Sequence, residues 1–139
     1  MASVALGRGL AVLLLALVAW EAHAEHEANH RYLILGYVKD AKGRPLRGVA
    51  VRVTRVKTGL GYNETSDQNG FYAIIVHLDD EDLGEQLHVS ARTASVLHTA
   101  QFNQADARTE RGTRLDFVGT RVEERRSWFF GTLKQYLSR

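Results

Sequence analysis

The feature that most constrains the fold is an alternating segment framed by turns between residues 36 and 72. Val49, Val51 and Val53 fall on one side of an extended chain, and the residues between them fall on the other. A period of two is the pattern of a β-strand with one buried face. Glycine-containing turns at 40–43 and 67–70 bracket this strand, and the second turn ends in Asn-Gly, which tolerates the positive φ of a tight hairpin. The segment therefore predicts consecutive antiparallel strands.

Strand-like segments continue along the rest of the chain. They cover residues 32–38, 49–54, 62–66, 71–78, 86–93, 96–102 and 113–118. Seven short strands separated by turns are the spacing expected of a sandwich. We therefore expect an all-β fold, a seven-stranded antiparallel Greek-key β-sandwich over residues 31–119, in which Phe71 and the valines of 49–54 supply facing core layers.

Taken in order, these motifs resemble the carboxypeptidase regulatory-like domain, a transthyretin-like (prealbumin-like) β-sandwich. The matching residues are Gly36, Tyr37, Val38, Asp40, Gly43, Pro45, Leu46, Gly48, Val49, Ala50, Val51, Thr65, Asp67, Asn69, Gly70, Phe71 and Tyr72. The resemblance covers residues 33–118 and is of the bacterial envelope type. It implies a module that binds, spaces or stabilises, and it carries no catalytic residues that could be transferred to this chain.

The first 24 residues have the order of features of a secretory signal peptide. Arg8 lies near the start, an apolar run follows at 10–20, and small residues stand at Ala22 and Ala24. This order predicts cleavage after Ala24 and a periplasmic or secreted protein, with an uncleaved anchor as the alternative. Residues 25–30 are expected to be a flexible polar segment. The chain has no cysteine, so the core alone must hold the exported domain.

The C-terminal segment 120–139 changes period. Apolar residues recur there at helical intervals, which predicts an amphipathic helix, although Gly131 weakens it. The candidate partner-binding residues of this tail are Trp128, Phe129, Phe130, Leu133 and Tyr136. The aromatic side chains would dock on the sandwich or on a protein partner, or alternatively make peripheral contact with a membrane. The sequence favours docking or partner binding because Glu123 and Glu124 interrupt the basic face.

Composition and motifs limit the function. The 18 basic and 16 acidic residues are interspersed, so a nucleic-acid partner is not expected. No motif with a catalytic mechanism is recognisable, and we expect neither an enzyme nor a bound cofactor. The expected function is a non-enzymatic accessory or binding module of the cell envelope, which engages a protein partner through a sheet edge and the aromatic tail.

Two alternative functions stay open. His26 and His30 would make a metal-handling protein if they bound Cu, Zn or Ni, but two imidazoles without a scaffold make a poor site. A small transthyretin-like hydrolase would need a pocket lined by His and Arg, and His77, His88 and His98 fall on separate strands. A calcium site at Asp67 and Asn69, or at the acidic loop 79–82, would have fewer ligands than the ion requires.

Overall fold

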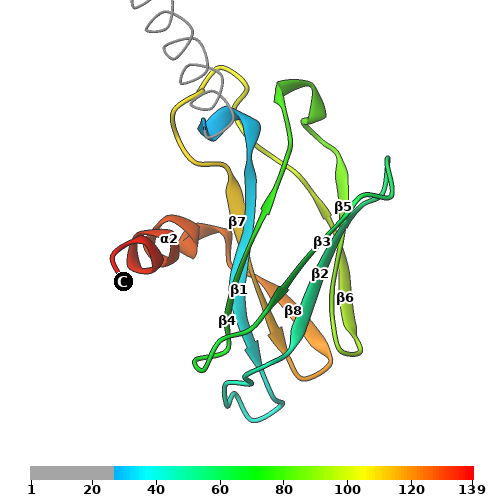
Figure 1. Ribbon diagram of the computed structural model, residues 1–139, viewed down its shortest axis with the longest axis vertical. Helices are drawn as coiled ribbons and strands as arrows, with labels where there is room; N and C mark the ends of the chain where they lie inside the picture. Colours follow the sequence, from blue (N-terminus) through cyan, green and yellow to red (C-terminus); the bar gives the residue numbers. More distant parts are fainter. Residues whose placement is uncertain (1–26) are drawn as a thin grey trace, which may run out of the picture.

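The computed structural model describes residues 27–139, which form two four-stranded sheets packed face to face (Figure 1). The first sheet, here the β1 sheet, has the order β4-β1-β7-β8, with β4 at Phe71–Val76, β1 at Tyr32–Lys39, β7 at Gly112–Val118 and β8 at Arg121–Glu124. The second, the β2 sheet, has the order β3-β2-β5-β6, with β3 at Gly61–Thr65, β2 at Ala50–Arg55, β5 at Gln86–Ala91 and β6 at Ala94–Thr99. Three 3₁₀ turns, η1 (Ala28–His30), η2 (Asp80–Asp82) and η3 (Arg126–Trp128), and one helix, α2 (Phe129–Leu137), complete the described chain.

The core lies between the sheets and is built by alternate residues of each strand. Val51 and Val53 of β2 are fully buried, as the period of two predicted. From β4, however, the core side chains are Tyr72, Ile74 and Val76. The assignment of Phe71 to the facing core layer is therefore wrong. Phe71 lies on the opposite face of β4, since neighbouring residues of a strand point to opposite faces.

The all-β sandwich is confirmed, but two details of the prediction are wrong. The described chain has eight strands rather than seven, and β1 pairs with β7 in parallel, from Leu33 opposite Gly112 to Lys39 opposite Val118. The additional strand is β8, which lies in the segment predicted to be helical. A tight turn at Gly119, with a φ of 61°, brings Arg121 back opposite Val118 and lets β8 pair with β7.

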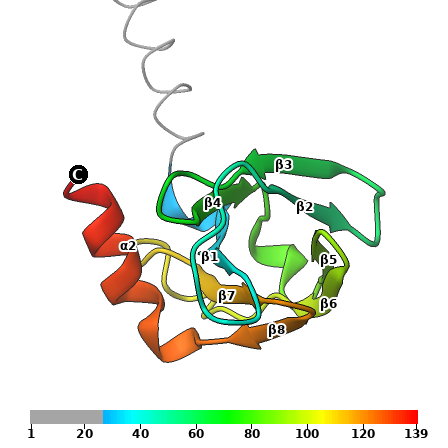
Figure 2. The ribbon, with the colours of Figure 1, turned by 90° about the horizontal axis from the view of Figure 1, so that it is seen from below.

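The C-terminal helix is shorter than the predicted 120–139 and lies outside the sandwich. It runs from Phe129 to Leu137 along the outer face of the β1 sheet (Figure 2). Phe129 and Leu133 are 2% and 5% exposed and pack on Leu33, Leu35 and Phe71. The hydrophobic effect of this contact docks the helix on the sandwich, which is one of the two outcomes expected for the tail.

The N-terminal predictions lie mostly outside the described residues. The signal peptide at 1–24 and the first part of the flexible segment 25–30 cannot be compared with the structure and stay predictions. The remainder of that segment has a defined structure, contrary to the expectation, because Ala28 is buried and His30 Nδ1 lies 2.7 Å from Asp79 Oδ1. Within residues 27–139, no helix is long and apolar enough to cross a membrane.

Candidate functional site

The sandwich has two sides at which the edge strands of its sheets meet. β3 and β4 meet at one side, and β6 and β8 meet at the other. Both sides are hollowed, but they differ in chemistry: polar contacts bridge the β6–β8 side, whereas the β3–β4 side is an apolar groove. This difference decides which of them is available to a ligand.

At the β6–β8 side, a chain of hydrogen bonds connects the two sheets. The Tyr32 hydroxyl lies 2.7 Å from His98 Nε2, and His98 Nδ1 lies 3.2 Å from Glu124 Oε2. Thr113 Oγ1 donates to the same Glu124 oxygen at 2.8 Å. Burial lowers the pKa of His98, more than the Glu124 carboxylate raises it. The neutral ring then donates from Nδ1 to Glu124 and accepts at Nε2 from Tyr32, so both ring nitrogens are occupied within the fold.

A shallow cavity of about 340 Å³ lies over this chain of hydrogen bonds, lined by Val96, Leu97, His98, Thr99, Gln101, Leu115, Val122, Glu124 and Arg126. It is the place that the hydrolase alternative would require, since it combines His98 with Arg126. A general base needs a ring nitrogen within reach of the substrate. His98 has no ring nitrogen available to a substrate, because Nε2 contacts Tyr32 and Nδ1 contacts Glu124.

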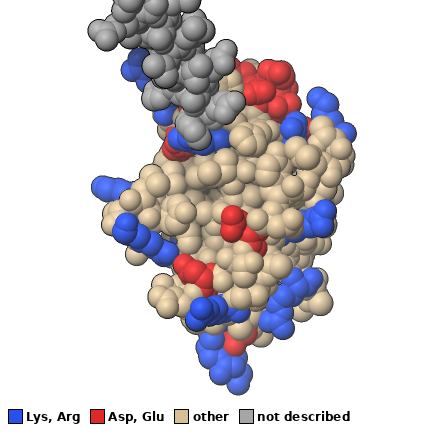
Figure 3. All heavy atoms as spheres, viewed as in Figure 1, with Lys and Arg blue, Asp and Glu red and all other residues tan. Residues whose placement is uncertain are grey.

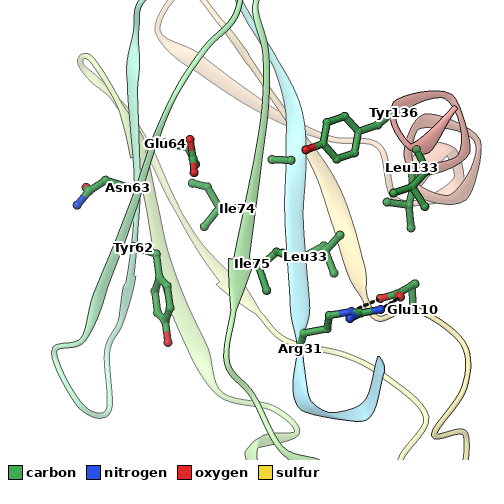
Figure 4. Close-up of a pocket in the computed structure, with 12 residues that line it drawn as sticks. Arg31, Leu33, Tyr62, Asn63, Glu64, Ile74, Ile75, Glu110, Leu133 and Tyr136 are labelled. Carbon is green, nitrogen blue, oxygen red and sulfur yellow. Dashed lines mark hydrogen bonds and ion pairs between the residues drawn. The ribbon is translucent and has the colours of Figure 1, made fainter. Parts of the chain in front are cut away.

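At the β3–β4 side lies a groove of about 520 Å³, here called the β4 groove (Figure 4). Its floor consists of Leu33 from β1 and Ala73, Ile74 and Ile75 from β4. One wall is β3 with Tyr62, Asn63 and Glu64, and the other wall is α2 with Leu133, Tyr136 and Leu137. Arg31 and Glu110 form an ion pair at one end (Figure 4).

Stacking and an ion pair fix the α2 wall of the β4 groove. The Tyr136 ring stacks on Phe71 with centroids 5.1 Å apart. The Arg139 guanidinium lies 4.9 Å from the Phe71 ring centroid, and its Nη1 lies 3.1 Å from Asp67 Oδ2. Leu137 nevertheless remains 69% exposed, and Ile75 on the floor remains 53% exposed. Exposed apolar side chains therefore face the groove from both the sheet and the helix.

The floor of the β4 groove is also the edge of a sheet. Within residues 27–139, β4 pairs with β1 on one side and with no strand on the other. Natural edge strands are usually protected by charged residues, proline or a bulge. The sequence of β4, Phe-Tyr-Ala-Ile-Ile-Val, contains no charge and no proline. The β4 groove thus combines an accessible backbone edge with apolar walls.

The structure separates the five residues that the sequence analysis grouped as partner-binding. Leu133 and Tyr136 line the β4 groove, and Phe129 is buried beneath α2. Phe130 is 55% exposed and borders a smaller cavity with Glu110. Trp128 immediately precedes α2 and does not line the groove.

Trp128 contacts two arginines. The guanidinium carbons of Arg114 and Arg125 lie 5.2 Å and 5.0 Å from its ring centroid. Both arginines also pair with Asp116, at 2.9 Å and 3.3 Å, and that carboxylate is buried. Cation–π contacts and a buried ion pair therefore fasten the start of α2 to β7. The contacts give Trp128 a structural role in the fold.

The candidate metal sites do not gain ligands in the structure. His26 lies outside the described residues, and His30 contacts Asp79. Asp67 Oδ1 accepts hydrogen bonds from the Asn69 and Phe71 amides, which is the Asx-turn arrangement. In the chain from 27 to 139, no group of three or more His, Cys, Asp or Glu side chains is arranged to hold a metal ion.

Charge does not mark a further site on the face seen in Figure 1. In that view, Lys and Arg lie mainly around the outline, Asp and Glu form small separate groups that include two on the middle of the face, and uncharged surface covers much of the rest (Figure 3). The acidic loop around η2 is neutralised locally, because Asp80 and Asp82 lie 2.8 Å and 3.5 Å from Arg111 and Arg55. Shape and apolar character, rather than charge, therefore distinguish the β4 groove.

Sequence reasoning did not find the floor of this site. Ile75 and Glu64 fall within the predicted strands 71–78 and 62–66, but neither was predicted to be a site residue. The absence of charge and proline in 71–76 is typical of a central strand, so the local sequence contained no signal of an accessible edge. Whether a strand lies at an edge depends on the order of strands in the sheet, and the local sequence does not contain that order.

No protein-family model matches this chain, and no curated protein matches it. Among solved structures it is similar to the dioxygenase domain of a dioxygenase–carbohydrate-binding fusion protein from Streptomyces sp. SirexAA-E, with a TM-score of 0.46 and 15% identity over 65% of this chain and 79% of that one. Chlorocatechol 1,2-dioxygenase from Pseudomonas putida matches with a TM-score of 0.44 and 16% identity over 64% of this chain. Hydroxyquinol 1,2-dioxygenase from Pseudomonas putida DLL-E4 matches with a TM-score of 0.44 and 15% identity over 68% of this chain.

The match spans 59% and 57% of the lengths of the two Pseudomonas enzymes. The prediction that this chain is not an enzyme is corrected by the comparison, because the solved structures that match are those of enzymes. The exclusion of enzyme activity is therefore withdrawn. At these identities and TM-scores, the likeness assigns no reaction and no residue of this chain.

Proposed function

We propose that the protein is a binding module whose β4 groove receives an extended segment of a protein partner, which adds a strand to β4. The observation that supports this proposal is the free edge of β4 on the floor of an apolar groove. In strand addition, main-chain hydrogen bonds supply affinity, and pockets for alternate side chains supply specificity.

The dimensions and walls of the groove suit such a segment. The six residues of β4 offer an edge of about 20 Å, since a strand rises about 3.3 Å per residue. Side chains of an added strand would point alternately to its two faces. Those on the outer face of the β1 sheet would contact Ile75 and Leu137, and those on the other face would contact Tyr62 and Glu64 of β3.

The proposal includes a location in the cell envelope. It rests on the secretory signal expected at residues 1–24 and on the resemblance to carboxypeptidase regulatory-like modules, whose bacterial members are found in envelope proteins. An exported partner or an exported region of a membrane protein would then supply the extended segment. The tail contributes through Leu133, Tyr136 and Leu137.

The proposal is tested with a synthetic peptide of alternating valine and threonine, Val-Thr-Val-Thr-Val-Thr-Val, blocked at both ends. Binding along β4 should slow hydrogen exchange of the β4 amides, measured by NMR on the labelled protein. Ile75→Glu should abolish the protection, because it places a charge on the apolar floor. The matched control is Leu97→Glu on β6, a similarly exposed residue at 59% against 53%, which should bind as the wild type does.

Two results would contradict the proposal. One is the failure of the peptide to protect the β4 amides of the wild-type protein, and the other is equal binding to the Ile75→Glu variant. Co-sedimentation with vesicles of phosphatidylcholine and phosphatidylglycerol tests the alternative of membrane contact. Vesicle binding that survives Ile75→Glu but is lost with Phe130→Ala, without any peptide binding, would replace the proposal by that alternative.

A further inference from the structure

One wall of the β4 groove contains an unpaired carboxylate. Three charged side chains line the groove, Arg31, Glu64 and Glu110. Arg31 and Glu110 are paired, with Nε of the arginine donating to Glu110 Oε2 at 2.9 Å. The side-chain carboxylate of Glu64 has no hydrogen bond and no ion pair with the other residues between 27 and 139.

The side chain of Glu64 is directed into the groove. It extends from β3 into the space beside β4 next to Ile74, whereas the neighbouring Asn63 points away from the groove (Figure 4). Neighbouring residues of a strand point to opposite faces, which explains the difference. On β3, Glu64 lies opposite Val51 of β2, so the register of the β2 sheet fixes its position along the groove.

An occupant of the groove would cover this carboxylate. Glu64 is exposed in the free protein, where water solvates it. A neutral segment lying along β4 would remove part of that water without replacing it, and an acidic segment would add repulsion. A lysine or arginine at the adjacent position would compensate the desolvation. The unpaired carboxylate therefore discriminates among extended segments by their charge.

We propose that the segment received by the β4 groove carries a lysine or arginine that pairs with Glu64 and is flanked by apolar residues. This inference rests on the proposed function. The alternation follows from strand geometry: the residue facing β3 is basic, and its two neighbours face Ile75 and Leu137 on the apolar side. The expected occupant is thus an extended protein segment with the pattern apolar–basic–apolar.

The test compares three peptides that differ only at the central residue of the alternating probe. In Val-Thr-Val-Xaa-Val-Thr-Val, the central residue is Lys, Thr or Glu, and affinities are measured by calorimetry at low ionic strength. We expect the Lys peptide to bind roughly fivefold more tightly than the Thr peptide, and the Glu peptide to bind more weakly than both. The formal net charge of the chain is +2, so a long-range field would favour the Glu peptide instead.

Substitutions of Glu64 test whether its carboxylate causes the preference for the Lys peptide. Glu64→Gln should remove the preference for Lys, and Glu64→Lys should reverse the order of the Lys and Glu peptides. The matched control is Glu81, an exposed acidic residue of η2 that does not line the groove. Glu81→Lys should preserve the order of the wild type. Added salt should reduce the preference, because the pair is close to the surface.

The outcomes separate this inference from the proposed function. Equal affinity for the three peptides, or an unchanged order in Glu64→Gln, would overturn the inference and leave strand addition to β4 intact. Failure of all three peptides to bind would overturn both. Protection of the β4 amides without any peptide, at concentrations where sedimentation shows a dimer, would also overturn both, since the occupant would then be a second copy of the chain.

Discussion

Gly112 sets how closely α2 approaches the sandwich. A Cβ atom at this position would lie 2.2 Å from the Leu33 backbone oxygen and 2.7 Å from two ring atoms of Phe129. The Phe129 ring therefore occupies space that a larger residue at the start of β7 would fill. A single glycine links the pairing of β1 with β7 to the docking of the helix.

Adding a single Cβ atom at Gly112 should destabilise the protein. Gly112→Ala should lower the free energy of unfolding by about 1–3 kcal/mol, the cost of overpacking, because neither the backbone oxygen nor the ring can move without disturbing its neighbours. Urea denaturation followed by circular dichroism measures the change. Gly131→Ala is the control: nothing lies within 4 Å of its added Cβ, and alanine favours the helix, so this variant should be at least as stable as the wild type. Equal stability of Gly112→Ala and wild type would show that the helix is not held by this contact.

At the scale of elements, two adjacent aromatic residues of α2 differ in how far they are buried. Phe129 is 2% exposed, and Phe130 is 55% exposed. The two residues are adjacent in the sequence and identical in type, so composition does not distinguish them. Their difference arises because successive residues of a helix point about 100° apart, and only one of them faces the β1 sheet.

This pair gives a matched prediction. Phe129→Ala should destabilise the protein by about 3–5 kcal/mol, since it leaves a cavity under α2. Phe130→Ala should change the free energy of unfolding by less than about 0.5 kcal/mol. Chemical denaturation of both variants makes the comparison. Similar losses from the two substitutions would contradict the docking of α2 described above.

The boundary between β8 and α2 gives a second prediction at this scale. A chain that ends after Arg125 keeps β8 and lacks α2, whereas one that ends after Thr120 lacks both. The shorter chain also loses Glu124, the partner of Thr113 and His98. We expect the first truncation to melt at a lower temperature but cooperatively, and the second to lose the cooperative thermal transition in circular dichroism. Identical thermal transitions of the two truncated chains would contradict the structural role assigned to β8.

At the scale of the whole molecule, the two sides of the sandwich respond differently to solvent. Buried polar contacts close the β6–β8 side, and the β4 groove leaves the other side open. The contacts of the closed side make stability depend on pH. Burial raises the pKa of Tyr32 to about 12 and lowers the pKa of His98, with Arg126 lowering it further.

The sign of the pH dependence follows from proton linkage. His98 binds a proton less readily in the folded state than in the unfolded state, so it contributes stability above a pH of about 6.5 that is lost as the pH falls through its lowered pKa. Tyr32 has the opposite shift, and its contribution is lost as the pH rises from about 10 to about 12. Stability should therefore decline on both sides of neutral pH.

Replacement of the histidine tests the acidic side. Between pH 7.5 and pH 5, the free energy of unfolding of His98→Gln should depend less on pH than that of the wild type, since the group that titrates is removed. Denaturant titrations at several pH values measure this slope. His88→Gln, at an exposed position of β5, should keep the slope of the wild type. An unchanged slope in His98→Gln would contradict the assignment of this histidine as the source.

Local patterns determined the kind of structure this chain forms. Alternation at Val51 and Val53 predicted a half-buried strand, and Asn69-Gly70 predicted a tight turn, because both depend on neighbouring residues alone. The hairpin expected at that turn is wrong, because β3 and β4 on either side of it lie in different sheets. Tertiary structure decided the rest. Residues 121–124 became β8 because β7 offered them an edge, and Phe71 faced outward because α2 covered it. The β4 groove exists because β4 pairs with β1, far away in sequence, and not with its neighbour β3, which pairs with β2 and so leaves β4 at the edge of its sheet. Such long-range pairings depend on the packing of the whole chain, which is why the sequence predicted a sandwich but not its open side.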